Sequence, residues 1–305
     1  MKKARIKKTS KRAQKPRLFI ILTFFAIFAL ILFAGCKKET KKETPAFGLK
    51  TVFVENAPPS NVTVGEKFAI YVDAQNVGAY TIPPQKASFY LLGLGTNVKG
   101  YTAKLKNSNT LASGASERLM FGNNVYSDLP LQSPFLLNML LESCYSYATN
   151  TQVKLCIAKQ SSAICSLTGE KIEDNSNSIG PIRISSLTER VEGNTLIVEF
   201  IIGNAGEGKV YMPSANCDGI VEGRTSEMLK ENIVKITIND GGIGLSCSLL
   251  NEGLSSIEGL SGYARLGAVT CKKKLGDEVA LGILQISTEY IYREKTEKGL
   301  TISPA

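Results

Sequence analysis

The pattern of hydrophobic and polar positions changes twice along the chain. Residues 18–35 carry no charge, and Thr23 is their one polar side chain. Residues 37–45 are almost all charged or polar and contain the sequence KKET twice. From residue 48 onward, short apolar segments alternate with turn residues, which is typical of β-strands. We therefore expect an N-terminal hydrophobic helix, a charged tether over residues 37–47 that is too polar to fold, and an all-β remainder.

The hydrophobic segment indicates a membrane anchor. Nine Lys or Arg residues and no acidic residue precede it. The apolar stretch is longer than the ~7–15 residues of a cleaved signal and reaches the ~17–25 residues of a membrane-spanning helix. Basic flanks stay in the cytoplasm, so we expect the N-terminus inside the cytoplasmic membrane and the remaining chain on its external face.

The anchor ends in a possible modification site. Residues 33–36 read Phe-Ala-Gly-Cys and resemble the lipobox of prokaryotic lipoproteins, with Phe33 where Leu is usual. The resemblance implies that Cys36 is lipidated and becomes the new N-terminus. Residues 1–36 are therefore interpreted either as a lipoprotein signal or as an uncleaved transmembrane anchor, and the sequence leaves both alternatives open.

Two motifs occur twice in the same order. Residues 65–78 and 193–206 both contain a glycine, four alternating apolar positions and a closing Asn-x-Gly, at an offset of 128 (193 − 65). Asn and Gly tolerate the positive φ that we expect in the closing turn. Residues 145–157 and 290–302 share Tyr-x-Tyr followed by Leu-x-Ile, at an offset of 145 (290 − 145). We infer two copies of one β domain, 48–157 and 181–305, joined by a polar linker over 158–180.

These motifs resemble the immunoglobulin-like β-sandwich domains, of the CARDB and fibronectin type, that recur on archaeal and bacterial cell surfaces. The strand that closes on Asn-x-Gly and a final Tyr-x-Tyr hairpin carry the resemblance. It implies two tandem sandwiches at the cell surface and brings no catalytic residue. The tyrosines share strand faces with apolar residues, so we expect all four on the core side: Tyr145, Tyr147, Tyr290 and Tyr292.

Composition excludes several functions. The formal charge is +9, but removing the nine basic residues of the N-terminus leaves 27 cations (36 − 9) against 27 acids. The exported part is neutral, so we expect no nucleic-acid partner. The chain contains no His, which excludes Ser-His-Asp, Cys-His and HExxH sites. No CxxC spacing supports a metal site, and we expect no cofactor.

The six remaining cysteines favour disulfides in an oxidising setting. They are Cys144, Cys156, Cys165, Cys217, Cys247 and Cys271. A hairpin centred on Asn150 would place Cys144 opposite Cys156, and Cys247 and Cys271 fall on expected neighbouring strands. Cys165 and Cys217 then remain as the third pair, which would limit movement between the copies.

Two further sites are predicted. Asn61 begins an Asn-Val-Thr sequon and is a candidate for N-glycosylation outside the membrane. Asp218, Glu222 and Glu227 are the acids that a carboxylate hydrolase would use, although their sequence favours turn and helix positions.

Three functions remain. The first, which we favour, is a non-enzymatic membrane-anchored surface protein that binds an unknown protein or glycan, for adhesion or envelope assembly. The second is a substrate-binding lipoprotein of a transporter or sensor, against which the lack of helical periodicity speaks. The third is an envelope hydrolase.

Overall fold

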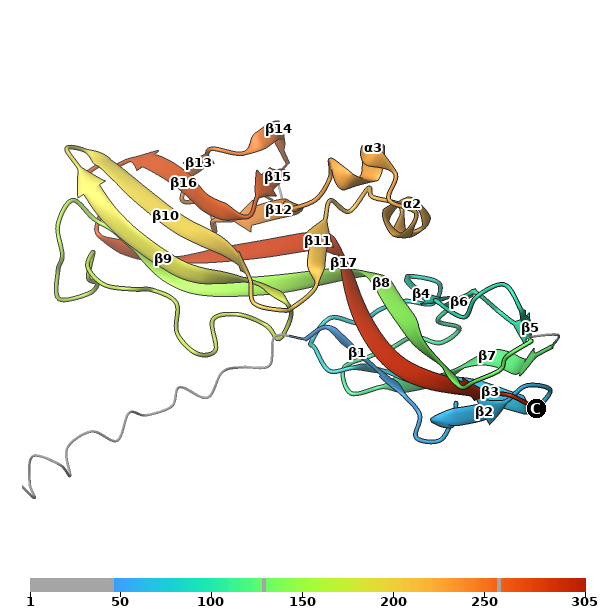
Figure 1. Cartoon of the computed structure of the whole chain (residues 1–305). Coiled ribbons are helices and arrows are strands. Elements are labelled where there is room, and N and C mark those ends of the chain that lie inside the picture. Colours follow the sequence, from blue (N-terminus) through green and yellow to red (C-terminus); the bar gives the residue numbers. More distant parts are fainter. Residues whose placement is uncertain (1–46, 128–129, 257–258) are drawn as a thin grey trace, which may run out of the picture. The chain divides into compact units, whose positions relative to one another are not determined.

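The computed structural model describes residues 47–127, 130–256 and 259–305, which belong to one compact unit, residues 44–305 (Figure 1). The expected hydrophobic helix, Cys36 and nearly all of the tether lie outside the described residues. Among the described residues, no helix has the length and apolar character needed to cross a membrane.

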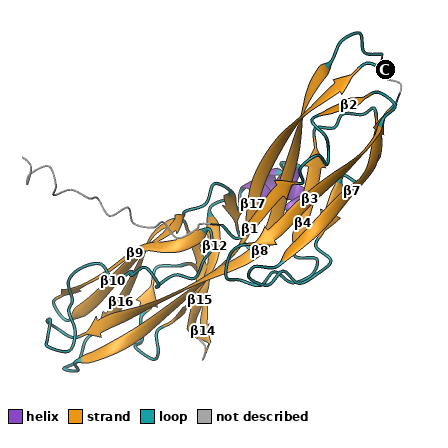
Figure 2. Ribbon diagram, turned by 90° about the horizontal axis from the view of Figure 1, so that it is seen from below, coloured by secondary structure: helices purple, strands orange, loops and turns teal. Residues whose placement is uncertain are grey.

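The prediction that the chain after the tether consists mainly of β-strands is confirmed for the described residues (Figure 2). Two short helices are the exceptions in the described part. The elements in chain order are β1 (Leu49–Phe53), β2 (Asn61–Thr63), β3 (Lys67–Asn76), β4 (Ala87–Leu92), β5 (Val98–Tyr101), β6 (Lys104–Lys106), β7 (Ser116–Tyr126), β8 (Phe135–Ile157), β9 (Ile182–Glu192), β10 (Thr195–Asn204), β11 (Lys209–Tyr211), α2 (Cys217–Val221), α3 (Thr225–Met228), β12 (Ile233–Asn239), β13 (Ser246–Cys247), β14 (Leu250–Ser256), β15 (Gly259–Arg265), β16 (Gly267–Lys274) and β17 (Ala280–Ser303).

The strands form one long sheet and two four-stranded sheets. The long sheet has the order β14-β15-β12-β17-β8-β4-β6, with β11 and β2 also paired to β17. The four-stranded sheets have the orders β1-β3-β7-β5 and β13-β16-β10-β9. A single apolar core joins both four-stranded sheets to one face of the long sheet. We call the end with β1, β3 and β7 the first lobe and the end with β9, β10 and β16 the second lobe.

Strands β8 and β17 connect the two lobes. Every residue from Phe135 to Ile157 has an antiparallel partner in β17. At about 3.4 Å per residue, this ladder is ~75 Å long. Figure 1 shows the two strands side by side from one lobe into the other.

The expected hairpin at Asn150 is therefore wrong, because residues 135–157 form one strand of 23 residues. Tight hairpin turns require positive φ, which Asn-Gly supplies. Thr151 follows Asn150, and its β-branched side chain prefers an extended strand. The segment contains no Gly or Pro that would end the strand.

The two lobes have matching strand pairings. Leu49 of β1 pairs with Asn76 of β3, and Ile182 of β9 pairs with Asn204 of β10. Beyond each pair, one further main-chain hydrogen bond forms, from Val77 N to Gly48 O (3.0 Å) and from Ala205 N to Pro181 O (2.8 Å). The two long strands predicted from the repeated motif are thus confirmed and have equivalent neighbours.

The closing Asn-x-Gly works differently from our expectation. Neither Asn76 nor Asn204 has a positive φ. Instead, each Asn amide group donates a hydrogen bond to the carbonyl four residues on, 2.6 Å for Asn76 and 2.8 Å for Asn204. Each Asn oxygen accepts the N–H of the glycine two residues on, at 3.1 Å. Side-chain bonding of this kind stabilises the turn.

The last strand serves both lobes. The first part of β8 pairs with β4 of the first lobe, and the first part of β17 pairs with β12 of the second lobe. Past its midpoint, β8 continues into the second lobe and β17 continues into the first lobe. The two strands remain paired with each other in both lobes. The domain boundaries at residues 157 and 181 stay a prediction. The structure adds that the end of each predicted copy lies in the lobe of the other copy, which we call the strand exchange.

Candidate functional site at the waist

The repeat and the ladder meet at one point. The repeat relates Tyr145 to Tyr290 and Tyr147 to Tyr292, whereas the ladder pairs Tyr145 with Tyr292 and Tyr147 with Tyr290. The paired residues Ser146 and Ile291 lie between these two tyrosine pairs. A rotation that superimposes one copy on the other can satisfy both relations only if its axis passes through this central pair. We call the region around this pair the waist.

The four tyrosines form the core of the waist. None is more than 2% exposed, which confirms the prediction that they lie on the core side. Adjacent ring centroids are between 5.9 and 6.2 Å apart, in tilted or edge-on arrangements that aromatic rings favour. Burial raises the pKa of every one of these hydroxyls, that of Tyr147 to about 12.

Each tyrosine hydroxyl accepts a main-chain N–H from the start of a strand or from a loop next to one. The hydrogen bonds are Leu49 N to Tyr145 (3.1 Å), Tyr80 N to Tyr147 (3.1 Å), Ile182 N to Tyr290 (3.4 Å) and Gly208 N to Tyr292 (2.9 Å). These donors occupy corresponding positions of the two copies. The tyrosines therefore satisfy buried or partly buried backbone groups in both lobes and are not a ligand platform.

The copies differ at several positions of the ladder, and one of these differences changes the bonding of the tyrosines. Glu294 lies 145 residues after Thr149 and takes its place in the second copy. Thr149 is 1% exposed, and its hydroxyl is 2.7 Å from the hydroxyl of Tyr290. Tyr145 instead donates to the carboxylate of Glu294 at 3.1 Å. A neutral hydroxyl in one copy thus corresponds to a half-buried carboxyl in the other.

Burial raises the pKa of Glu294 to about 7, from an ordinary value of 4.5. Repulsion from the Glu207 carboxylate adds to the increase, and the hydrogen bond from Tyr145 opposes it. The carboxyl of Glu294 therefore titrates near neutral pH.

A second difference opens space beside this carboxyl. Gly208 lies 128 residues after Tyr80 and takes its place in the second copy. The Tyr80 ring packs edge-on against Tyr147, with centroids 5.4 Å apart. At Gly208, a Cβ atom would lie 2.9 Å from Cγ of Glu294 and 2.3 Å from the carbonyl oxygen of Arg293. Glycine therefore provides the room in which Glu294 lies.

These two differences contribute to a pocket of about 470 Å³, which we call the waist pocket. Its walls come from the start of β1, the residues that lead into β11, and the middle of β17. The side chains of interest below are Phe47, Lys50, Glu207, Lys209, Glu294 and Lys295.

The cations around the pocket are largely paired with acids outside it. Arg293 donates to both carboxylate oxygens of Glu142, at 2.9 and 2.7 Å, and Lys295 lies 3.2 Å from the same carboxylate. Lys209 pairs with Glu231 at 3.0 Å. In the described part of the chain, no ion pair joins Glu294 to a lysine of the pocket.

A disulfide holds the opposite face of the waist. Cys144 of β8 is bonded to Cys217 of α2, with Cα atoms 5.8 Å apart. Asp218, next in α2, accepts a hydrogen bond from Tyr90 of β4 at 2.7 Å and pairs with Lys104 of β6. Helix α2, which comes from the second copy, is thereby fixed to the first lobe.

Two of the three expected disulfide pairings are wrong. Cys144 and Cys156 lie on the same extended strand, separated by about 40 Å at ~3.3 Å per residue, so they cannot bond to each other. Cys156 is bonded to Cys165, and Cys217 to Cys144. The third pairing, Cys247 with Cys271, is present, on paired positions of β13 and β16.

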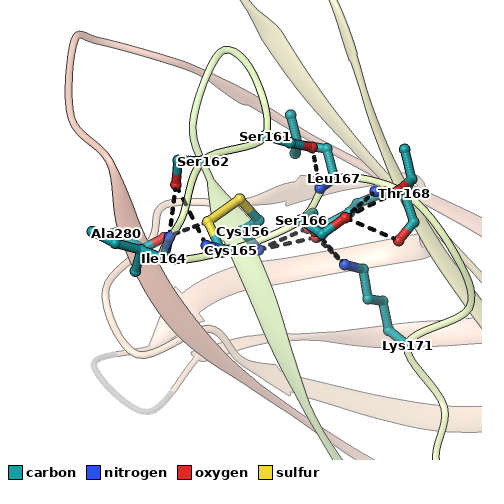
Figure 3. Close-up of a disulfide and its surroundings, with 11 residues drawn as sticks. Cys156, Ser161, Ser162, Ile164, Cys165, Ser166, Leu167, Thr168, Lys171 and Ala280 are labelled. Carbon is teal, nitrogen blue, oxygen red and sulfur yellow. Dashed lines mark hydrogen bonds and ion pairs between the residues drawn. A yellow bond between two sulfur atoms is a disulfide. The ribbon is translucent and has the colours of Figure 1, made fainter.

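The disulfide Cys156–Cys165 fixes the linker to β8. Figure 3 shows the loop around it, in which the hydroxyl of Ser162 accepts the N–H groups of Ile164 (3.2 Å) and Cys165 (3.4 Å). Lys171 donates to the carbonyl of Ser166 at 2.5 Å. Beyond this loop, Glu170 accepts the N–H of Leu187 in β9 at 2.6 Å, and Lys171 pairs with Glu189 of the same strand at 2.7 Å. The linker is therefore held to the second lobe by both covalent and polar contacts.

The other predicted residues lie apart from the waist pocket. Asn61 is exposed on β2, and its side-chain oxygen accepts a hydrogen bond from Ser303 at 2.9 Å. The candidate acids all bind neighbouring groups: Asp218 as described, Glu222 with Arg224 (2.6 Å) and Glu227 with Lys230 (3.0 Å). Interactions of this kind hold the two short helices in place.

Sequence reasoning missed Glu294 and Gly208. The signal was present, since aligning the copies at offsets of 128 and 145 places Gly208 against Tyr80 and Glu294 against Thr149. Shared residues reveal the repeat, whereas the pocket depends on the residues that differ between the copies.

Comparisons with known proteins name no family for this chain. No family model matches it, and no curated protein matches it. Among solved structures, it is similar to the secreted serine protease VesC from Vibrio cholerae, with a TM-score of 0.18 and 8% identity, over 83% of this chain and 51% of that one. The chain thus spans about half the length of that protein, and at this TM-score the similarity carries no conclusion.

Proposed function

We propose that this chain is a membrane-anchored cell-surface protein that binds a partner outside the cell without catalysing a reaction. Each lobe is an immunoglobulin-like sandwich whose last strand comes from the other copy. The N-terminal segment holds the protein at the cytoplasmic membrane, and the lobes face outward.

The observation that carries this proposal is the continuous ladder of β8 and β17. Proteins that close two lobes around a substrate rotate them about a few hinge residues. Here two extended strands pass through the waist, and the disulfide Cys144–Cys217 fixes α2 across it. A molecule built in this way holds its binding surfaces at constant separation, which favours adhesion or envelope assembly over a transporter's substrate-binding protein.

Surface labelling tests the location. Intact cells that express the full chain are treated with a membrane-impermeant amine reagent, and the labelled lysines are mapped by mass spectrometry. We expect lysines after residue 46 to be labelled in intact cells. Those before residue 18 should be labelled only after lysis if the anchor is uncleaved, and should be missing if Cys36 is the new N-terminus. Labelling of both groups only after lysis contradicts the proposed location. Intact mass of the extracted protein shows in addition whether Cys36 is lipidated.

The absence of catalysis has its own test. The purified chain is incubated with peptide, ester and glycoside substrates, with Asp218→Ala as the comparison. Sustained turnover that Asp218→Ala abolishes contradicts the proposal and supports the hydrolase.

A further inference from the structure

The waist pocket has the features of a built site. The two copies agree around the waist in strand register and in the main-chain N–H groups that the tyrosine hydroxyls accept. Several other positions differ between the copies, and two of these differences, at Gly208 and Glu294, line the pocket. Departures from local consistency in a protein concentrate at functional sites. Gly208 in place of Tyr80 makes room, and Glu294 in place of Thr149 supplies a carboxyl in that room.

The Glu294 carboxyl has unused bonding capacity. One of its oxygens accepts a hydrogen bond from Tyr145. A carboxylate has about four acceptor positions, and removing it from water is costly unless they are used. A ligand that donates hydrogen bonds into the pocket would relieve this cost.

The balance of charge indicates a neutral ligand. The cations around the pocket are Lys50, Lys209, Arg293 and Lys295, and the acids of the pocket and of the ion pairs are Glu142, Glu207, Glu231 and Glu294. An anion would approach Glu207 and Glu294, and a cation would approach the lysines. The hydroxyl groups of a neutral ligand can donate hydrogen bonds to the carboxylates and accept hydrogen bonds from the lysines.

The pocket also has an aromatic surface and a suitable size. Phe47 lines the pocket and is 42% exposed. Its ring presents an apolar face of the kind on which the C–H face of a sugar ring packs. A volume of about 470 Å³ lies within the ~300–1,000 Å³ of small-molecule sites and accommodates a disaccharide.

We propose that the waist pocket binds a neutral saccharide, whose hydroxyl groups donate to the Glu294 carboxylate and whose ring packs on Phe47. This inference rests on the proposed function, because it names the ligand class of a surface-binding protein.

The test uses the full chain in nanodiscs, with chitobiose and maltose as probes. Saturation-transfer NMR at about pH 8, where Glu294 is ionised, detects binding, and titration gives the Kd. We expect a transfer signal from at least one of the two disaccharides. Glu294→Gln should raise its Kd about tenfold or more, as expected for loss of a charged hydrogen bond.

Glu297→Gln is the matched control, since Glu297 is an exposed acid on the same strand outside the pocket. It should retain the wild-type Kd, whereas Phe47→Ala, a second variant, should weaken binding. Thermal unfolding of each variant shows that it is folded. The inference fails if neither disaccharide gives a signal, or if Glu294→Gln and Glu297→Gln both bind as the wild type does. If saccharide binding fails but surface labelling gives the expected pattern, the proposed function stands and only this inference is wrong. If surface labelling fails, the proposed location at the cell surface is wrong, whatever the binding result.

Discussion

Tyr145 lies directly opposite Tyr292 in the ladder between β8 and β17, with ring centroids 6.0 Å apart. Tyr145 accepts a main-chain N–H from β1 in the first lobe, and Tyr292 accepts one from Gly208 in the second lobe. One pair of side chains thus stabilises both lobes. Because the strands that carry the pair also run through both lobes, we expect the lobes to depend on each other for folding.

Removing residues 293–305 should destabilise the first lobe, although these residues end the second copy in sequence. They pair with the first part of β8, which loses its neighbour on that side. Hydrogen exchange of the full and shortened chains should show faster exchange in β3 and β7 of the first lobe. If protection is lost only within residues 181–292, the strand exchange described above is wrong.

Loss of the disulfide Cys144–Cys217 should lower stability more than loss of Cys156–Cys165. The first closes a separation of 73 residues and the second one of 9. Chain entropy predicts about 4 kcal/mol and about 2–3 kcal/mol of stabilisation for loops of these lengths. Urea unfolding of the two double Cys→Ser variants measures the difference, and peptide mapping under non-reducing conditions verifies the pairings. Equal losses of stability in the two variants would contradict the conclusion that the disulfide Cys144–Cys217 fixes α2 to the first lobe.

Glu294 should make the protein less stable as the pH rises through the slightly acidic range. The folded-state pKa is about 7 and the ordinary value is 4.5, so between these values the folded state holds a proton that the unfolded state has lost. The stability that this proton provides is complete below about pH 4.5 and is lost as the pH approaches 7.

At about 1.4 kcal/mol per pH unit, the full effect is at most ~3–4 kcal/mol, and partial exposure of the side chain reduces it. Urea unfolding at about pH 5 and about pH 8 measures it. Glu294→Gln should remove this component of the pH dependence, and Glu297→Gln should retain it. An unchanged slope in Glu294→Gln would show that the carboxyl is well solvated.

Tyr292→Phe should destabilise the fold by about 1–3 kcal/mol, because the partly buried main-chain N–H of Gly208 loses its acceptor and the side chain of Asn204 loses a donor. Tyr101→Phe is the control, since Tyr101 is 38% exposed and should tolerate the change. Thermal unfolding compares the two variants. Equal stability would mean that water replaces the lost hydroxyl.

Local features of the fold were readable from the sequence. The alternation of Phe68, Ile70, Val72 and Ala74 predicted β3 because side chains on a strand point to opposite faces in turn. The same rule placed Tyr145 and Tyr147 on the core face, and the repeat identified β10 as the counterpart of β3.

The candidate site was not readable in the same way. The pocket combines residues from β1, the segment before β11 and β17, which are far apart in sequence. Nothing near Glu294 in the sequence indicates burial, since its neighbours are Arg293 and Lys295. Its altered pKa arises from the packing of other segments around it.

The sequence by itself determined which residues face the core, where the strands of the repeat lie, and that the chain after residue 17 carries equal numbers of cations and acids. These properties depend on side-chain period and composition, which act within a few residues. Only the tertiary structure decided that β8 continues past Asn150, that Cys144 bonds Cys217, and that Glu294 lies in a pocket. The reason is that an extended strand has the same local pattern whether it turns back on itself or continues, and its choice of partner depends on contacts with segments more than a hundred residues away.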